Sequence, residues 1–340
     1  MVQQRSIFCL SRAHAPVLHW RTNPRARYRA TPMEPSFQGG WVAPVAAGWG
    51  EKVQFYLEDA HRRGPDTGCW ETSTAETFVK DGQVYSYRPA PEIEPARRDY
   101  DPRRPFQLKS KILGENRNVR IYLPRGYRQH TEHHYPVLYM KDGQNIFERG
   151  AFGTWNAQAS LDRLSARGEI QEIIVVAVDH GVGRFQDYVP PEDGGKADRY
   201  AQFLVSELKP WVDNHYRTLS GPADTGILGS SLGGVAALYT AWNHSHVFGK
   251  VASMSGSWWL KSWRDRLSRQ GKRPLRCYID SGDSGYARDC VHHTVTLGGL
   301  LRGIGFSHDL LHHVEKGHTH TESAWGQRLE KPLKFLFPAA

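Results

Sequence analysis

The sequence predicts a mixed α/β fold in which helices cover a mostly parallel sheet, with a smaller β-rich module ahead of it. From about residue 106, short runs rich in Val, Ile and Tyr alternate with segments of helical periodicity. Strands separated by helices are typical of a parallel sheet, because each connection between parallel strands crosses one face of the sheet. The composition changes near residue 105, which divides the chain into a module at 1–105 and a larger domain at 106–340.

Residues 1–105 are predicted to hold β segments and a linker. Residues 1–50 show little periodicity, whereas 52–59 and 76–87 carry the alternating apolar positions of strands, the latter around an Asp81-Gly82 turn. Residues 88–105 contain five prolines and many charges. Because proline is excluded from helix interiors and central strands, this last stretch is expected to be a linker.

In the larger domain, strands and helices are expected in alternation. The expected strands are 118–124, 135–140, 172–178, 250–256, 274–282 and 307–315, the helices are 155–168, 199–216 and 291–305, and 225–242 runs from a short strand into a helix. Gly168 ends the first helix as a C-cap glycine does. In the second helix, Phe203, Leu204 and Leu208 lie on one side, as expected for a helix that packs on a sheet.

Charge and cysteine content exclude several classes of protein. Lys and Arg outnumber Asp and Glu by 44 to 35, but the basic residues are scattered, so we expect no nucleic-acid partner and favour a small anionic substrate. The four cysteines, Cys9, Cys69, Cys277 and Cys290, show no metal-ligand spacing. Neither a metal nor an organic cofactor is therefore expected.

Hydropathy argues against a membrane protein. No run reaches the roughly 18 apolar residues that a membrane span needs. The first 20 residues hold one short apolar patch, interrupted by Arg12 and His14, which is too weak for a signal peptide. A cytoplasmic location is expected, and a homo-oligomer is left open.

Gly229-Ser230-Ser231-Leu232-Gly233-Gly234 is the strongest local signal in the chain. It fits the pattern G-x-S-x-G with Ser231 at its centre, between an apolar strand and an Ala-rich helix. Small residues around such a serine let strand and helix approach closely, and the helix N-terminus favours developing negative charge. This context predicts a nucleophile on an α/β-hydrolase sheet; a Gly/Ser-rich turn without chemistry is the alternative.

A serine nucleophile needs a base, and in this fold the chain order is serine, acid, histidine. The histidines after Ser231 are His244, His246, His292, His293, His308, His312, His313, His318 and His320. A base in a loop after the final strand is favoured, which leaves His318 and His320. His320 is preferred because residues 321–325 lead from it into a helix, and a solvated His-rich loop is the alternative.

Three aspartates could supply the acid. Asp280 falls inside the strand 274–282 and is expected to point into the structure, whereas Asp283 opens the following loop, where aspartates often form turns. Asp289 precedes the next helix and could equally cap it. The 31 positions from Asp289 to His320 suffice for one helix and one strand. Asp289 is therefore the preferred acid, with Asp283 as the alternative.

Several motifs in order resemble the putative-esterase family, which includes enterochelin esterases, feruloyl esterases, esterase D and mycobacterial mycolyltransferases. They are YPVLYMKDGQNIF, SELKPWVDNHYRT, GILGSSLGGVAALY, FGKVASMSGSWWL and HTESAW, and the resemblance covers about residues 106–337. It implies that Ser231 is the nucleophile and that His320 is the base, since HTESAW is similar to the family's His-Asn-Glu-Ala-Ala-Trp run. The family's acid closely follows a glycine, whereas the loop from Gly282 to Asp289 is longer.

Acyl transfer also needs hydrogen-bond donors for an oxyanion. The main-chain N–H of Leu232 is the first candidate, because it follows the nucleophile. The loop 141–145 resembles the family's Asp-Gly-x loop and offers the main chain of Gln144 as the second, with a simple turn at 142–143 as the alternative. Arg184, Asp187 and Tyr188 resemble the family's Arg-x-x-Glu-Tyr stretch and are expected either to line the cleft or to hold a loop.

These residues predict a serine hydrolase that acts on a small carboxylic ester through an acyl-enzyme. The resemblance to enterochelin esterases, which carry a β-sandwich module ahead of the hydrolase, suggests a siderophore as one such ester. Two alternatives remain. One is an acyltransferase with the same Ser-His-Asp site, and the other is a catalytically silent carbohydrate-binding protein that uses its N-terminal module.

Overall fold

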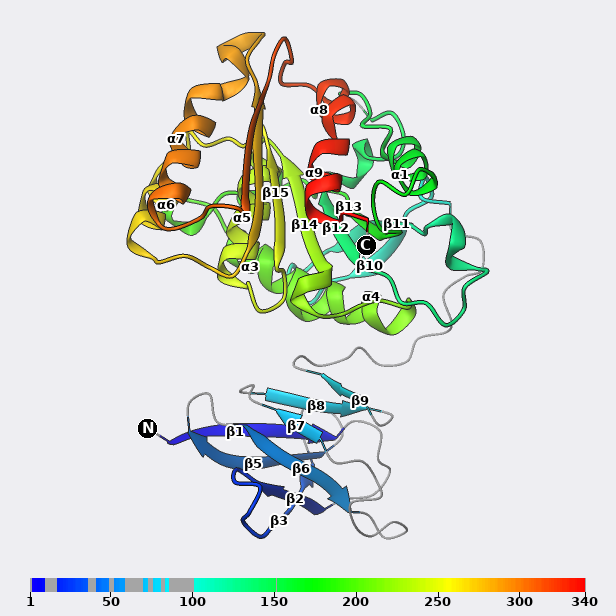
Figure 1. Ribbon diagram of the computed structural model, residues 1–340, viewed down its shortest axis with the longest axis vertical. Coiled ribbons are helices and arrows are strands. Elements are labelled where there is room, and N and C mark those ends of the chain that lie inside the picture. Colours follow the sequence, from blue (N-terminus) through cyan, green and yellow to red (C-terminus); the bar gives the residue numbers. More distant parts are fainter. Residues whose placement is uncertain are drawn as a thin grey trace. The chain divides into compact units, whose positions relative to one another are not determined.

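The computed structural model (Figure 1) describes residues 2–9, 17–35, 41–48, 52–58, 70–72, 76–80, 83–85, 101–150 and 152–339. The chain divides into two compact units, Met1–Glu92 and Ile93–Ala340. The expected turn at Asp81-Gly82, Cys69, and residues 88–100 of the expected linker lie outside the described residues.

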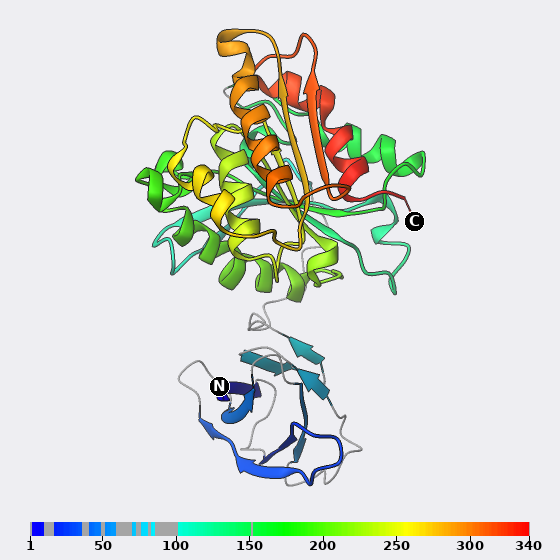
Figure 2. The same ribbon diagram turned by 60° about the vertical axis from the view of Figure 1, so that its left-hand side comes forward.

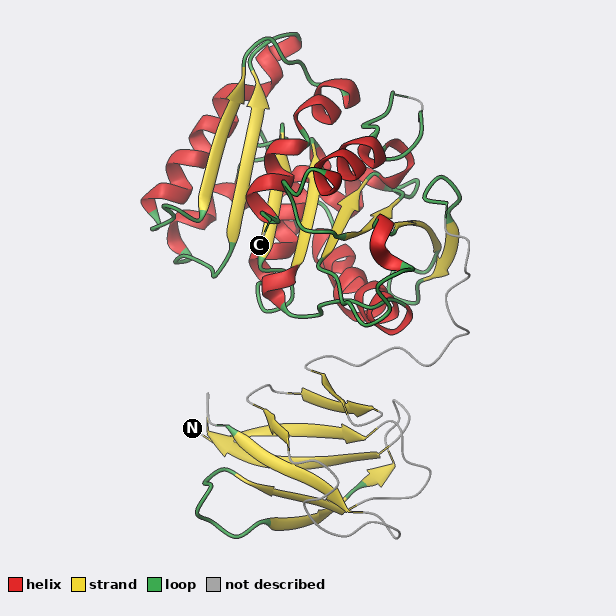
Figure 3. Cartoon of the chain, turned by 45° about the vertical axis from the view of Figure 1, so that its right-hand side comes forward, coloured by secondary structure: helices red, strands yellow, loops and turns green. Residues whose placement is uncertain are grey.

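The first unit contains two sheets. Its strands are β1 (Val2–Cys9), β2 (Val17–Arg21), β3 (Arg29–Pro32), β4 (Glu34–Pro35), β5 (Trp41–Gly48), β6 (Val53–Glu58), β7 (Trp70–Thr72), β8 (Glu76–Lys80) and β9 (Gln83–Tyr85). They form the sheets β4-β5-β1-β8-β9 and β3-β2-β6-β7, drawn among the yellow arrows of Figure 3. Ile7 and Val45 of the first sheet share one buried cluster with Leu18 and Phe55 of the second. The apolar faces of the two sheets thus form the core of this unit.

Five of these strands lie within residues 1–50, where the sequence shows little periodicity. The alternation in β5 is carried by Ala43, Val45 and Ala47, which are buried, while the intervening positions are more exposed. Small apolar residues contribute little to a hydrophobic pattern, so this strand is weakly marked in the sequence.

The second unit is built on one sheet of eight strands. These are β10 (Phe106–Lys109), β11 (Asn116–Tyr122), β12 (Val137–Lys141), β13 (Ile174–Val178), β14 (Thr225–Ser230), β15 (Lys250–Met254), β16 (Arg276–Gly282) and β17 (Leu310–Glu315). Their order is β10-β11-β13-β12-β14-β15-β16-β17. The pairs β10–β11 and β11–β13 are antiparallel, and the pairs from β13 to β17 are parallel. The predicted, mostly parallel α/β sheet is confirmed.

Helices cover both faces of this sheet (Figures 1 and 2). They are α1 (Ala157–Ala166), α2 (Arg184–Tyr188), α3 (Ala197–Phe203), α4 (Lys209–His215), α5 (Leu232–Asn243), α6 (Ser262–Arg266), α7 (Val291–Gly303), α8 (Glu322–Arg328) and α9 (Glu330–Leu336). In β12, Tyr139 packs in a cluster with Phe203 of α3, whereas Leu138 packs in a second cluster with Leu161 of α1 and Leu333 of α9. This alternation places one apolar layer on each face, as parallel strands buried on both sides require.

The parallel strands bring the candidate site residues to one edge of the sheet. Ser231 follows β14, and Asp289 and His320 follow β16 and β17. A 3₁₀ turn that contains Gln144 follows β12. Because parallel strands end at the same edge, residues far apart in the chain meet there. Among the helices that the structure describes, none is long and apolar enough to span a membrane.

Candidate active site

Ser231 stands on a sharp turn between β14 and α5. Its φ of +55° and ψ of −126° are rare for a residue other than glycine. A Cβ atom on Gly229 would lie 2.3 Å from the carbonyl oxygen of Gly233, and one on Gly234 would lie 2.6 Å from Oγ of Ser253. The glycines are therefore required by the close approach of strand and helix, as expected for a nucleophile elbow.

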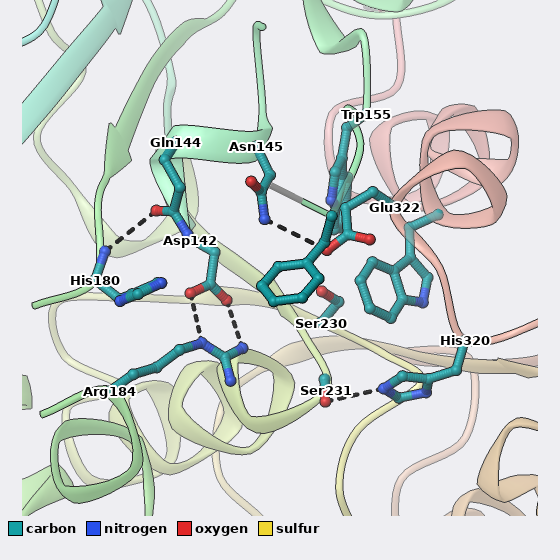
Figure 4. A pocket seen from close by; sticks show the side chains of 12 residues that line it. Asp142, Gln144, Asn145, Trp155, His180, Arg184, Ser230, Ser231, His320 and Glu322 are labelled. Carbon is teal, nitrogen blue, oxygen red and sulfur yellow. Dashed lines mark hydrogen bonds and ion pairs between the residues drawn. The ribbon is translucent and has the colours of Figure 1, made fainter. Parts of the chain in front are cut away.

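The structure joins the three preferred residues in one chain of hydrogen bonds. His320 Nε2 lies 2.9 Å from Ser231 Oγ, and His320 Nδ1 lies 2.6 Å from Asp289 Oδ1 (Figure 4 shows the first of these contacts). An ionised carboxylate only accepts, so Nδ1 donates and Nε2 is left to accept from the serine hydroxyl. The hydroxyl has a second neighbour that the sequence did not indicate, Oγ of Ser257 at 3.3 Å.

Asp289 is fully buried and is held through both of its oxygens. While Oδ1 faces His320, Oδ2 accepts hydrogen bonds from Ser255 Oγ at 2.6 Å and from the main-chain N–H of Gly282. Burial alone would raise the pKa of Asp289. Hydrogen bonds from His320, Ser255 and Gly282 outweigh that effect and hold the pKa below its ordinary value. Asp289 is thus an ionised acceptor at neutral pH.

A left-handed turn brings Asp289 to the imidazole. Ala287, Arg288, Asp289 and Cys290 have φ values of +50°, +48°, +50° and +59°. Left-handed backbone costs a residue other than glycine roughly 1–2 kcal/mol. Because of this turn, the Asp289 carboxylate reaches His320 although the loop is longer than in the family pattern. The sequence did not predict this turn.

The competing acid and base candidates lie elsewhere. Asp283 Oδ1 accepts from Gly317 N at 2.7 Å and from Ser284 Oγ at 2.9 Å, which makes it a turn residue. Asp280 is buried inside β16, as expected, and accepts from Arg328 and from the hydroxyl of Tyr278. The main chain of His318 passes beside Gly282, where a Cβ would lie 2.0 Å from the His318 carbonyl oxygen.

The candidate oxyanion donors come from two elements. Leu232 is the first residue of α5, and Gln144 lies in the 3₁₀ turn Gly143–Asn145. Asp142, just before that turn, has a φ of +56°. Its carboxylate accepts two hydrogen bonds from Arg184, at 2.7 and 2.8 Å, and its main-chain N–H donates to the hydroxyl of Tyr188. Arg184 and Tyr188 therefore hold the loop that carries Gln144.

A pocket of about 240 Å³ opens beside Ser231 (Figure 4). It is lined by Asp142, Gln144, Asn145, Phe152, Trp155, His180, Arg184, Ser230, Ser231, His320, Glu322 and Trp325. Asp187 belongs elsewhere, since it pairs with Arg117. Glu322 accepts from Asn145 Nδ2 at 3.3 Å, and burial, together with the charge of Asp142, raises the pKa of Glu322. No sequence pattern had marked Phe152, Trp155 or His180 as pocket residues.

Four exposed aromatic side chains, here called the aromatic rim, stand on segments that follow the carboxyl ends of strands in the large sheet. They are Phe152, Phe185, Trp259 and Tyr286, with exposed fractions of 78%, 47%, 49% and 97%. These segments follow β12, β13, β15 and β16 in turn. Phe152 lines the pocket, Phe185 is adjacent to Arg184, and Trp259 stands two positions after Ser257. Exposed apolar side chains beside a cleft are typical of binding surfaces, and Phe152 is the member of the rim that lines the pocket.

Among the described residues, no group of three or more His, Cys, Asp or Glu side chains is arranged to hold a metal ion. A serine hydroxyl on an imidazole, an imidazole on a buried carboxylate and a nearby loop of main-chain N–H groups are the parts that acyl transfer needs.

Several known proteins similar to this chain are esterases. Residues 110–298 match the sequence model of the family described as Putative esterase. An esterase of Mycobacterium tuberculosis is 29% identical over 153 residues, which cover 44% of this chain and 31% of that relative. Among solved structures, a ferulic acid esterase is similar with a TM-score of 0.56 and 23% identity, over 68% of this chain and 96% of the other. The enterobactin esterase of Shigella flexneri has a TM-score of 0.58 and 17% identity, over 95% of this chain and 88% of the other.

Proposed function

The chain belongs to the Putative esterase family, and we propose that it hydrolyses carboxylic esters through an acyl-enzyme formed on Ser231. The observation that carries the proposal is the chain of hydrogen bonds from Asp289 through His320 to Ser231, at 2.6 and 2.9 Å. Both distances lie within the range that proton transfer between a nucleophile and its base requires.

In the first half of the reaction, Ser231 Oγ attacks the ester carbonyl carbon while His320 Nε2 takes the hydroxyl proton. The carbonyl oxygen becomes an oxyanion, which the main-chain N–H groups of Leu232 and Gln144 stabilise. When the intermediate collapses, the bond to the alcohol breaks, and His320 returns its proton to the departing oxygen. Asp289 keeps the imidazole in the tautomer that can accept from Ser231 and stabilises the imidazolium.

In the second half, water replaces the alcohol. His320 takes a proton from the water as its oxygen attacks the acyl carbon, and the carboxylic acid leaves as Ser231 regains its proton. An acceptor alcohol in place of water would give a new ester, which is the acyltransferase reaction. Because the matching family and the similar proteins are described as esterases, hydrolysis is the activity that we propose.

The proposed substrate is a small ester with a flat or branched acyl or alcohol part. Two features support this choice: a pocket of about 240 Å³, and the aromatic rim, of which Phe152 lines that pocket. Similarity in fold to an enterobactin esterase extends over 95% of the chain, which makes a cyclic siderophore ester the first natural substrate to test.

Two assays test the proposal. A fluorophosphonate probe should label the wild type on Ser231, as read by peptide mass spectrometry, and the Ser231→Ala variant should neither react nor hydrolyse p-nitrophenyl acetate. Ser268→Ala, a substitution at an exposed serine, is the matched control and should behave as wild type. Near-normal turnover by Ser231→Ala would refute the mechanism.

A panel of short acyl, feruloyl and trilactone esters, each with and without an added acceptor alcohol, then identifies the substrate class. Free acid as the main product supports hydrolysis. Transfer to the alcohol as the main product would instead assign the site to an acyltransferase.

A further inference from the structure

A buried cluster of charged and polar side chains lies behind Asp289 and takes no part in the steps above. Its centre is Arg328, in the last turn of α8, which is 1% exposed. Arg328 Nε donates to Asp280 Oδ2 at 2.9 Å, and Arg328 Nη2 lies 3.4 Å from Asp289 Oδ2. The same Nη2 donates to Ser255 Oγ. One guanidinium thus bridges two fully buried carboxylates.

Ser255 connects this cluster to the site. Its hydroxyl donates to Asp289 Oδ2 at 2.6 Å and accepts from Trp325 Nε1 at 2.9 Å as well as from Arg328. The φ of Ser255 is +44°, a strained value for a serine. Trp325 in turn stands edge-on to the imidazole of His320, with ring centroids 5.0 Å apart. The contacts converge on the oxygen of Asp289 that does not touch His320.

The charges beside Asp289 indicate what its contact with Arg328 could contribute. Desolvation makes a buried carboxylate costly to ionise, and a second carboxylate beside it raises that cost further. For Asp280, burial outweighs the nearby Arg328 charge and raises its pKa. Asp289 would face a second negative group without a cation if Arg328 were removed. The titratable groups in or beside the cluster are His320, Arg328, Asp280, Tyr278 and Cys290.

We propose that Arg328 is a positioning residue, which, with Ser255, keeps Asp289 ionised and oriented toward His320. This role rests on the proposed function, because it acts on the reaction only through Asp289 and His320. A merely structural role, in which Arg328 neutralises Asp280 inside the fold, is the competing explanation. The two explanations differ in what happens when Asp280 is neutralised at the same time.

The test compares Arg328→Met, Asp280→Asn and the double variant with the wild type. The single Arg328→Met change leaves two carboxylates without a cation and is expected to lower stability. The double variant retains one negative charge, on Asp289, and so regains the net charge of the wild-type cluster, counting His320 as neutral. If Arg328 positions Asp289, the double variant regains stability in urea unfolding, but its kcat remains at least about tenfold below wild type, with KM little changed.

Two further readouts accompany kcat. Loss of a cation within about 4 Å is expected to move the acidic limb of kcat against pH upward, because that cation disfavours protonation of the hydrogen-bonded pair of Asp289 and His320. The downfield proton signal of the His320 Nδ1–H, observed by NMR, is expected to weaken in Arg328→Met and in the double variant.

Two results would overturn the inference: wild-type kcat, pH profile and NMR signal in the double variant, or the same wild-type values in Arg328→Met. Neither would touch the proposed function, which fails separately if the wild type lacks esterase activity or if Ser231→Ala retains it.

Discussion

Replacing Asp289 by asparagine tests the site most sharply, because the surroundings dictate how the new amide must sit. The N–H of Gly282 can only donate, and Arg328 can only donate, and both face Oδ2. The amide oxygen must therefore take the place of Oδ2, which turns the NH₂ group toward His320 Nδ1. An imidazole that accepts at Nδ1 carries its proton on Nε2, and it then donates to Ser231 instead of accepting.

The expected loss is about 10⁴-fold in kcat, which corresponds to about 5 kcal/mol of transition-state stabilisation. That figure is the effect of forcing the wrong tautomer in a serine protease triad. The fold should survive, because asparagine fits the shape of aspartate and tolerates left-handed backbone better than most residues do. Position 289 has a φ of +50°, so the substitution does not add backbone strain.

The assay is steady-state hydrolysis of p-nitrophenyl acetate, with circular dichroism to check the fold. Asp283→Asn is the matched control; since Asp283 only caps a turn through Gly317 and Ser284, turnover should stay within about twofold of wild type. If Asp289→Asn retains more than a tenth of wild-type activity, or if Asp283→Asn proves the more damaging change, the argument from the tautomer is refuted.

Three other outcomes are expected. His320→Ala should cost several orders of magnitude in kcat and His318→Ala little, since His320 is the one of these two histidines that contacts Ser231 Oγ. The reverse order in a turnover assay would reassign the base. Ala287→Gly should raise the free energy of unfolding by about 0.5–1 kcal/mol, because glycine relieves left-handed strain at an exposed position. Urea titration measures this change, and a lower free energy of unfolding in the variant would contradict the prediction. The pKa of Asp289 is lowered in the folded protein, so its contribution to stability is present above the unfolded pKa of about 3.9 and is lost as the pH falls through the folded value. Between pH 7 and pH 3, the free energy of unfolding should therefore fall further in the wild type than in Asp289→Asn. An equal fall in the two proteins would contradict this prediction.

Much of the secondary structure of the second unit could be predicted from local patterns, because the hydrophobic period and the turn residues of an element lie in neighbouring positions of the sequence. The strand–turn–helix around Ser231 is one example, where the glycines that the sequence displays are those that the close backbone approach requires. The helix expected at 199–216 is another: it is present, but interrupted by a π-helical turn at Leu204–Leu208 that no periodicity reveals.

Features that depend on contacts between residues far apart in the chain could not be predicted from the sequence. Arg328 meets Ser255, 73 positions away, and Asp289, 39 positions away, and nothing near Arg328 in the sequence shows that it is buried. The left-handed turn at 287–290 contains no glycine, so its conformation is imposed by tertiary contacts against local preference. Asp289 could be preferred because the 31 positions between it and His320 suffice for one helix and one strand, but the reason that it reaches His320 lies in that turn.

The aromatic rim is distinct from the hydrogen-bonded residues that, in the proposed function, would break an ester. Ser231 sits directly at the end of β14, and Asp289 is tied into a buried network. Phe152, Phe185, Trp259 and Tyr286 are instead exposed on the segments that follow β12, β13, β15 and β16. Exposed loop residues can be exchanged at little cost in stability. Under the proposed function, substitutions at these four positions are expected to change which esters are accepted and to leave the contacts among Ser231, His320 and Asp289 in place.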